Sequence, residues 1–345
     1  MYETDVLIVG GGLSGLSAAY HLKKNGVSRV TVIERMSGDA YGHYHRTCGE
    51  AVSERLFAAS GVPKGCIVRD VRGMRITFGD TDIDIPMKGH IIDRERLLAD
   101  LRDGADADIV NDSVIDVERI PEGYLVTTRG EQYRCRYLIG ADGAFSLVRK
   151  RMFGYSPLDK VAVVNNIVER DSGPDLLCFE VSSKYPGMYR WDFPSKDGRR
   201  SIGYACGTDD IEDHIEQGIR FIATGRDGPV VKDRCCLIGD AAVLTNPLCY
   251  GGIGAALISG RKAAECILKD DLTPYGRWVD HDRMFDHHFM EAQATFKGWS
   301  EEDFADAVRP FRKGYSLLRG GYAIIRRPKW ANVYTSIWVA FRRCW

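Results

Sequence analysis

The N-terminus contains the pattern that most constrains the fold of this chain. The stretch "DVLIVGGGLSGLSAAYHLKKNGVSRVTVIER" predicts an apolar strand, a glycine turn, a helix and a second apolar strand. Gly10, Gly12 and Gly15 form a G-x-G-x-x-G motif, which permits a tight turn, close approach to a pyrophosphate and close helix packing. Glu34 ends the second strand about twenty residues later, where a carboxylate can accept hydrogen bonds from a ribose. This order of elements predicts a Rossmann-like dinucleotide-binding domain.

Two later segments repeat the combination of an apolar strand, a turn and an acidic residue. In "YLIGADGAFSLVRK" the strand leads to Asp142, and in "RCCLIGDAAVLTNPLCYGGIGAALISGRKAAE" it leads to Asp240. In the second segment Gly251, Gly252 and Gly254 open an alanine-rich helix, whose first backbone N–H groups can face a ligand. The sequence contains no second G-x-G-x-x-G unit with a strand before and an acid after it, so we expect no separate NAD(P)H domain.

The composition is that of an ordinary globular chain. It has 345 residues, 44% of them hydrophobic, and a formal net charge of -1. Neither a signal peptide nor an apolar run of about 18 residues is evident, so we expect a cytoplasmic location. The ten cysteines are scattered and lack the spacing of an iron–sulfur site. We therefore expect reduced thiols, no metal and no nucleic-acid partner.

With these three segments the chain resembles the FAD-binding family that includes p-hydroxybenzoate hydroxylase and the FixC-like reductases. In that family the Gly-Asp motif holds the ribityl chain of the flavin. The N-terminus of the helix that follows lies against the pyrimidine end of the isoalloxazine. Asp240 and Gly252 to Ile253 match these positions. The resemblance implies one non-covalently bound FAD.

Two further segments resemble the geranylgeranyl reductase family within that group. "PGMYRWDFPSKDGRRSIGYACG" is similar to its Y-x-W-x-F-P segment, and "RTCGEAVS" is similar to its cysteine-glycine motif beside the flavin. The resemblance covers about residues 5 to 270. It implies a reductase that saturates isolated double bonds of a polyprenyl chain, such as those of archaeal digeranylgeranylglycerol phospholipids. Val243 and Tyr250 stand where glycine is common in the family, which leaves chain length and headgroup open.

The resemblance also implies a set of cofactor-binding residues. These are Gly10, Gly12, Gly15, Glu34, Arg35, Arg46, Cys48, Gly49, Arg94, Asp142, Asp240, Gly251, Gly252 and Ile253. Cys48 is the residue we expect nearest the reaction, as a proton donor or as the group that orders a water. A buried structural cysteine is the alternative.

An aromatic strand is the expected substrate wall. Tyr189, Trp191 and Phe193 alternate with polar residues, so in a strand they share one face. Such a face is usually plain core, but the resemblance places it, together with Pro247, against the prenyl chain. It also places Tyr189 and Trp191 at the catalytic site.

Domain organisation follows because three distant segments must meet at one cofactor. We predict an α/β chain, α+β overall, with a discontinuous FAD-binding domain made of residues 1–68, 88–152 and 226–270. Alternating insertions predict a second, antiparallel-sheet substrate domain made of residues 69–87 and 153–225. Residues 271–345 are expected to form a short, mainly helical extension.

The C-terminal segment is strongly basic. From Arg309 to Trp345 it has nine Lys or Arg residues and no Asp or Glu. Basic and aromatic residues alternate there in a pattern that fits an anionic membrane surface. The residues concerned are Arg326, Arg327, Lys329, Arg342, Arg343, Trp330, Tyr334, Trp338 and Trp345. Peripheral docking on the inner face of the cell membrane is one interpretation, and packing of this segment on the second domain is the other.

Other functions remain open at this level. A flavin-dependent monooxygenase or halogenase would share the cofactor motifs, and so would a non-enzymatic flavin redox carrier or sensor. An external electron donor is required, and ferredoxin, a deazaflavin and NAD(P)H are the candidates. The sequence leaves the oligomeric state open.

Overall fold

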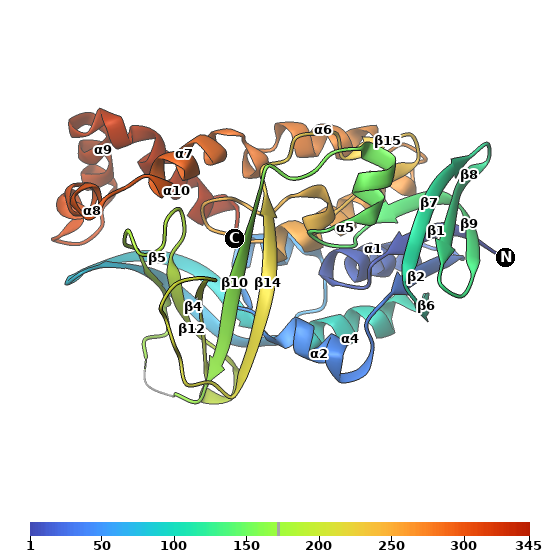
Figure 1. Cartoon of the computed structure of the whole chain (residues 1–345), viewed down its shortest axis with the longest axis horizontal. Coiled ribbons are helices and arrows are strands. Elements are labelled where there is room, and N and C mark those ends of the chain that lie inside the picture. Colours follow the sequence, from blue (N-terminus) through green and yellow to red (C-terminus); the bar gives the residue numbers. More distant parts are fainter. Residues whose placement is uncertain (171–172) are drawn as a thin grey trace.

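In the computed structural model, which describes residues 1–170 and 173–345, the N-terminal fingerprint forms a parallel pair of strands (Figure 1). The pair is β1 (Tyr2–Val9) and β2 (Val30–Glu34), joined by α1 (Leu13–Lys24). Every residue of β2 is buried, as expected for a parallel strand covered on both faces. The first sheet runs in the order β15 (Val231–Lys232), β16 (Cys235–Leu237), β9 (Gln132–Gly140), β1, β2 and β6 (Asp108–Asn111), with β8 (Gly123–Thr128) against β9 and β7 (Val114–Ile120) against β8.

Strand register brings the predicted motifs to one edge of this sheet. Val9 at the end of β1 is paired with both Ile33 and Gly140, and Gly140 is paired with Leu237. These strands are parallel, so their carboxyl ends lie together. The glycine turn, Glu34 and the two Gly-Asp turns therefore meet although they are far apart in the chain.

The second sheet also has eight strands in the part of the chain that the structure describes. Its order is β14 (Glu216–Thr224), β10 (Asp159–Val168), β13 (Arg200–Ala205), β12 (Arg190–Pro194), β11 (Leu177–Glu180), β4 (Ile67–Phe78), β5 (Thr81–Ile92) and β3 (Ala51–Ser53). The pairs are antiparallel except β4 with β11, which is parallel. The α/β class with a second sheet is thus confirmed. This sheet takes in residues 51–53 and 88–92, beyond the ranges that the sequence pattern predicted.

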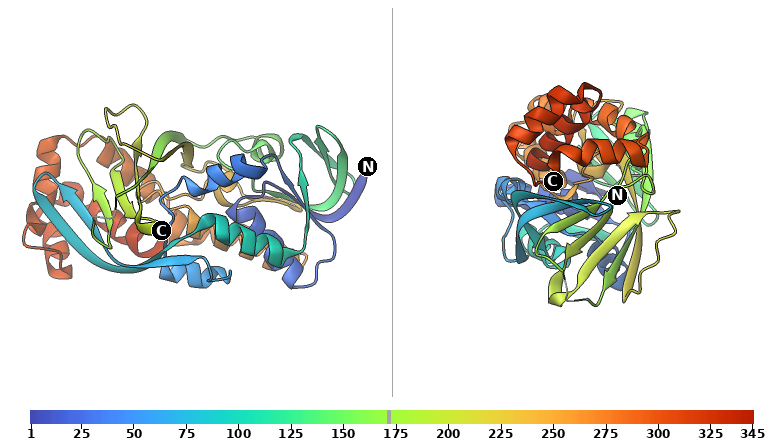
Figure 2. Two further views of the ribbon diagram at one scale, coloured as in Figure 1. Left: turned by 90° about the horizontal axis from the view of Figure 1, so that it is seen from below. Right: turned by 90° about the vertical axis from the view of Figure 1, so that its left-hand side faces the viewer.

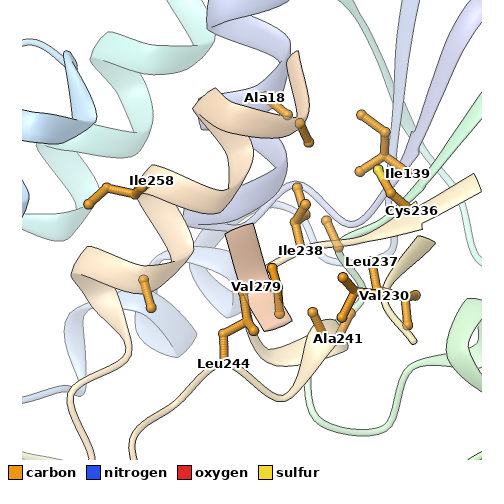
Figure 3. Packing of buried hydrophobic residues seen from close by; sticks show 14 of the residues in the cluster. Ala18, Ile139, Val230, Cys236, Leu237, Ile238, Ala241, Leu244, Ile258 and Val279 are labelled. Atoms are coloured by element: carbon orange, nitrogen blue, oxygen red, sulfur yellow. The ribbon is translucent and has the colours of Figure 1, made fainter. Parts of the chain in front are cut away.

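Helix packing closes one face of the first sheet. In α5 (Ile253–Ile267), Gly260 crosses α1 so closely that a Cβ there would lie 2.5 Å from the carbonyl oxygen of Ser14. Figure 3 shows Ala18 of α1 and Ile258 of α5 on one side of the core and the strand residues Ile139 and Cys236 on the other. The other helices of this half are α2 (Gly38–Arg46), α3 (Glu54–Ser60) and α4 (Arg94–Ala105). Asp93 caps α4, and its carboxylate accepts from the N–H of Arg96 at 3.1 Å.

The C-terminal region is helical, as predicted, and lies beside the second sheet (Figure 2). Its helices are α6 (Thr273–His281), α7 (His288–Lys297), α8 (Glu301–Val308), α9 (Leu317–Arg326) and α10 (Ala331–Arg343). Short helical turns lie at Arg149–Phe153, Lys196–Gly198, Gly239–Ala242, Arg283–Phe285, Arg309–Phe311 and Pro328–Trp330. Phe304 of α8 stacks on Phe78 of β4 with ring centroids 5.5 Å apart, and Phe341 of α10 contacts Phe179 of β11. Helices α8 and α10 thus pack on the second sheet, whereas α6 packs on α5 and on β15 of the first sheet.

Part of the predicted basic–aromatic surface is buried in this packing. Trp330 is 8% exposed in a cluster with Phe296, Trp299 and Phe304, and Trp345 is 6% exposed. Trp338 remains 44% exposed. Within residues 1–170 and 173–345, no helix combines the length and the apolar character that a bilayer crossing requires.

Candidate functional site

The glycine loop after β1 approaches neighbouring backbone more closely than any side chain allows. Gly10 has a φ of 104°, and a Cβ there would lie 2.3 Å from the carbonyl oxygen of Ala141. A Cβ at Gly15 would lie 1.9 Å from the oxygen of Gly10. The Glu34 carboxylate accepts from the N–H of Gly11 at 2.7 Å and from that of Met36 at 2.8 Å. The loop and the acid are therefore held together at one end of the first sheet.

A cavity of about 830 Å³ opens above this loop, between the two sheets. It is in the volume range of cofactor sites, and segments from both sheets line it. The predicted residues that line it are Gly10, Gly12, Glu34, Arg35, Cys48, Gly49, Arg94, Asp142, Tyr189, Trp191, Phe193, Asp240, Gly251, Gly252 and Ile253. The fold thus gathers fifteen of the predicted residues around one space.

Three predicted residues lie elsewhere. Gly15 packs beneath the loop, where it allows α1 to approach β1. The Nε of Arg46 donates to Glu216 at 2.8 Å, so this guanidinium joins α2 to β14 instead of facing the cavity. Pro247 is buried in the loop that leads to α5, outside the set of lining residues.

Three buried donor atoms on residues that line the cavity fit an oxygen-rich ligand such as FAD. Among the described residues, Nε2 of His45, Nε of Arg94 and Nδ2 of Asn165 are buried without a hydrogen-bond partner. Arg94 can only donate, so its Nη2, 3.1 Å from Nδ1 of His45, makes Nδ1 an acceptor and leaves the ring proton on Nε2. Burial, and then the charge of Arg94, lower the pKa of His45 to about 2. The imidazole of His45 is therefore neutral, and its Nε2–H has no acceptor among the described residues.

The two Gly-Asp turns have different local roles. The Asp142 carboxylate accepts from Ser146 Oγ at 2.5 Å and from the N–H of Leu147 at 2.7 Å, so it is used within its own turn. Asp240 accepts from Thr245 Oγ1 at 2.8 Å, and burial raises its pKa. Gly252 caps α5 without a side chain, so the first N–H groups of this helix face the cavity unobstructed.

The cysteine-glycine motif brings an acid that the sequence pattern did not single out. Cys48 lines the cavity beside Arg94, and its Sγ accepts from the N–H of Glu50 at 3.5 Å. Glu50 is 2% exposed, has a φ of 53°, and accepts from the N–H of Arg94 at 3.0 Å. Burial raises the pKa of Glu50 to about 8, so its carboxyl group is protonated at neutral pH. An acid directly after Cys-Gly, in an otherwise small and apolar run, was the available signal.

The aromatic residues share one face, as the alternation predicted. Tyr189, Trp191 and Phe193 are all buried. The Tyr189 hydroxyl donates to the carbonyl of Cys249 at 2.6 Å, and Trp191 Nε1 donates to Asn165 Oδ1 at 3.2 Å. With these polar groups satisfied, the rings offer apolar surface to the cavity.

A second cavity, of about 450 Å³, lies between the second sheet and the C-terminal helices. Its wall is almost wholly apolar and includes Ile76, Ile83, Phe296, Trp299, Phe304, Leu317, Ile324 and Trp338. Phe179, Tyr189 and Phe341 line both cavities. The centre of the Phe179 ring lies 4.8 Å from that of the Tyr189 ring and 5.2 Å from that of the Phe341 ring. The two cavities therefore adjoin at three aromatic rings. Sequence reasoning missed this wall, although the density of aromatic residues after residue 275 was a signal.

Comparisons with known proteins agree on a flavoprotein. A family model described as an FAD binding domain matches residues 3–156. The digeranylgeranylglycerophospholipid reductase of Thermoplasma volcanium is 26% identical over 330 residues, which cover 79% of this chain and 81% of that protein. Digeranylgeranylglycerophospholipid reductase 2 of Methanothermobacter thermautotrophicus is 28% identical over 309 residues, which cover 76% of this chain and 78% of that protein. A geranylgeranyl bacteriochlorophyll reductase-like structure from Thermoplasma acidophilum shares the fold, with a TM-score of 0.80 and 22% identity. The match covers 98% of this chain and 99% of that one.

The orphaned donor of His45 leads to a binding prediction. His45→Ala should weaken FAD binding by the apoprotein about tenfold, because one buried hydrogen bond to the cofactor is lost. Titration of apoprotein with FAD, followed by flavin fluorescence, measures this affinity. His43→Ala removes a neighbouring, less buried imidazole and should bind FAD as the wild type does. Equal affinity of all three proteins would contradict a contact between His45 and FAD.

Burial of Glu50 predicts a pH-dependent stability. Its folded-state pKa of about 8 lies above the ordinary value of 4.5, so the native protein holds this proton more tightly than the unfolded chain. Wild-type stability should therefore fall relative to Glu50→Gln as the pH rises from about 4.5 to about 8, by about 5 kcal/mol. Urea unfolding of both holoproteins across this range measures the difference. A difference that stays constant with pH would contradict the raised pKa.

Proposed function

Since this chain belongs to the geranylgeranyl reductase family of FAD-dependent oxidoreductases, we propose that it saturates isolated carbon–carbon double bonds in the geranylgeranyl chains of a membrane lipid. The observation that carries the proposal is the apolar cavity of about 450 Å³ that adjoins the cofactor cavity. A prenyl chain has no hydrogen-bonding groups, so only burial can hold it, at about 25 cal/mol per Å². The aromatic and aliphatic wall supplies such burial.

The junction of the two cavities is where we place the reacting double bond. Phe179, Tyr189 and Phe341 line both cavities, so a chain that lies in the apolar cavity reaches the cofactor cavity past these rings. Tyr189 is held by its hydrogen bond to Cys249, and it contacts both Trp191 and Phe179. We propose that Tyr189, Trp191 and Phe193 orient the chain at this junction. We give Pro247 no direct part in substrate binding, because it is buried in its own loop.

The chemistry needs a hydride and a proton. Bound FAD, once reduced, is a source of hydride. Cys48 lies in the wall of the same cavity, and we propose that its thiol delivers the proton to the neighbouring carbon or orders a water that does so. The N–H of Glu50 fixes the position of Cys48 Sγ, and the protonated Glu50 carboxyl group adds a second acid to the same wall.

The alternative functions do not explain the apolar cavity. A hydroxylase or halogenase of the same fold would not need a long apolar cavity beside the cofactor. A redox carrier or sensor would not need an enclosed space for hydrocarbon. We propose an external electron donor, either ferredoxin, a deazaflavin or NAD(P)H, and a peripheral position on an anionic membrane surface.

The direct test is reduction of a prenyl lipid. We expect the holoprotein, reduced with dithionite, to add two hydrogen atoms for each double bond of a geranylgeranyl lipid, as read from the product mass. Flavin spectra follow reoxidation in the same sample. Reoxidation by oxygen alone, with a hydroxylated or halogenated product and no saturated lipid, would contradict a reductase.

A cysteine substitution separates chemistry from binding. Cys48→Ala should lower the rate of alkene reduction at saturating lipid about a hundredfold, because general-acid catalysis contributes on this scale. Reduction of the flavin by dithionite should survive. Cys206→Ala removes an exposed thiol directly after β13, and this variant should reduce alkenes at the wild-type rate. A Cys48→Ala enzyme with the wild-type rate would make Cys48 structural.

A further inference from the structure

Helix α9 (Leu317–Arg326) has an apolar face that the described part of the chain leaves uncovered. Leu318, Tyr322 and Ile325 are 87%, 53% and 78% exposed. Their spacing of four and three residues places them on one side of the helix. Isolated exposed apolar residues are ordinary, but three large ones aligned on one helix indicate a surface that contacts something else. We call this surface the α9 apolar face.

Cations lie on α9 and just before it. The Arg326 guanidinium lies 5.7 Å from the centre of the Tyr322 ring, and Arg312 and Lys313, which precede α9, are exposed. Residues 309–345 contain no Asp or Glu. Two other cations of the segment are used within the fold, since Arg327 pairs with Asp306 at 3.1 Å and Lys329 pairs with Asp303 at 3.7 Å. The segment that carries the α9 apolar face is thus positively charged.

An adjoining side of the same helix lines the apolar cavity. Leu317, Gly320 and Ile324 belong to its wall. Leu317 is also 64% exposed, and Trp338, another wall residue, is 44% exposed. A wall residue that is also exposed marks a place where the cavity reaches the surface. The mouth of the apolar cavity therefore lies beside the α9 apolar face. Helix α9 itself lies at the end of the molecule farthest from the first sheet (Figure 1).

We propose that α9 docks the protein on an anionic lipid bilayer, with Leu318, Tyr322 and Ile325 inserted at the boundary between headgroups and acyl chains. Amphipathic helices bind bilayers in this way, and each nearby cation adds to the attraction of anionic headgroups. The contact holds the cavity mouth against the bilayer, so that a hydrocarbon chain enters without crossing water. The entry of a hydrocarbon chain from the bilayer rests on the proposed function, whereas the docking itself does not.

The charge pattern favours a bilayer over a second copy of the chain. A two-fold dimer through the α9 apolar face would bring the same patch, with its cations, against itself. Like charges at such a contact repel each other, and the segment has no acid to offset them. The docking surface differs from the set of basic and aromatic residues expected from the sequence. Of that set only Arg326 lies on α9, and its Trp330 and Trp345 are buried.

Vesicle binding by the holoprotein tests the proposal. We expect the wild type to sediment with vesicles of phosphatidylglycerol and phosphatidylcholine, and to bind vesicles of phosphatidylcholine alone much more weakly. The double variant Leu318→Glu, Ile325→Glu should bind the anionic vesicles at least about tenfold more weakly than the wild type, because two inserted apolar side chains are replaced by charges. Ile211→Glu places the same charge at another exposed isoleucine, which is 92% exposed, and should bind as the wild type does. Flavin absorption checks that each variant is folded.

Three results would overturn the proposal. One is a wild type that does not bind anionic vesicles, and another is a double variant that binds them as tightly as the wild type. The third is a wild-type dimer in solution that the double variant dissolves while vesicle binding is unchanged, because the α9 apolar face would then join two copies. Turnover separates this inference from the proposed function. Vesicle binding that depends on α9, without saturation of any prenyl lipid, supports docking and rejects the reductase.

Discussion

The site depends on the close approach of two backbone turns, the glycine loop after β1 and the turn after β9. A Cβ at Gly10 would lie 2.3 Å from the carbonyl oxygen of Ala141, so only glycine lets the loop fit there. The parallel register of β1 and β9 sets this meeting, since Val9 is paired with Gly140. Everything that faces the cofactor cavity is placed relative to that contact. The second sheet and its aromatic residues then form the other side of the cavity.

The polar residues around Cys48 in the cavity wall hold one another in place. Arg94 fixes the tautomer of His45 through a 3.1 Å contact and donates its N–H to Glu50 at 3.0 Å, so one residue orients a neutral donor and a neutral acid. Glu50 in turn fixes Cys48 by its own N–H. Burial keeps His45 and Glu50 uncharged at neutral pH, by opposite shifts of their pKa values. A site of this kind suits an uncharged hydrocarbon substrate.

Local patterns predicted the elements that local physics controls. The glycine motif, the acid at the end of β2 and the alternation of Tyr189 with Trp191 all follow from neighbours in sequence, and the structure has each of them. The same patterns were less informative where a residue has two suitable partners. Arg46 belongs to the predicted cysteine-glycine motif, but Glu216 on a distant strand takes its guanidinium away from the cavity.

By itself the sequence determined the α/β class, the FAD-binding fold and the glycine, acidic and aromatic residues at the ends of the strands that meet at the cofactor cavity, because glycine turns and buried strands are encoded within a few residues. Only the tertiary structure decided that Glu50 is a buried neutral acid, since its burial depends on segments that the chain brings together from far apart. The same holds for the apolar cavity, whose wall combines the β4–β5 hairpin with α7 to α10. Tertiary packing likewise buried Trp330 and left Leu318 and Ile325 exposed, because the helix face that meets a sheet is set by the partner surface as well as by the pattern of the helix.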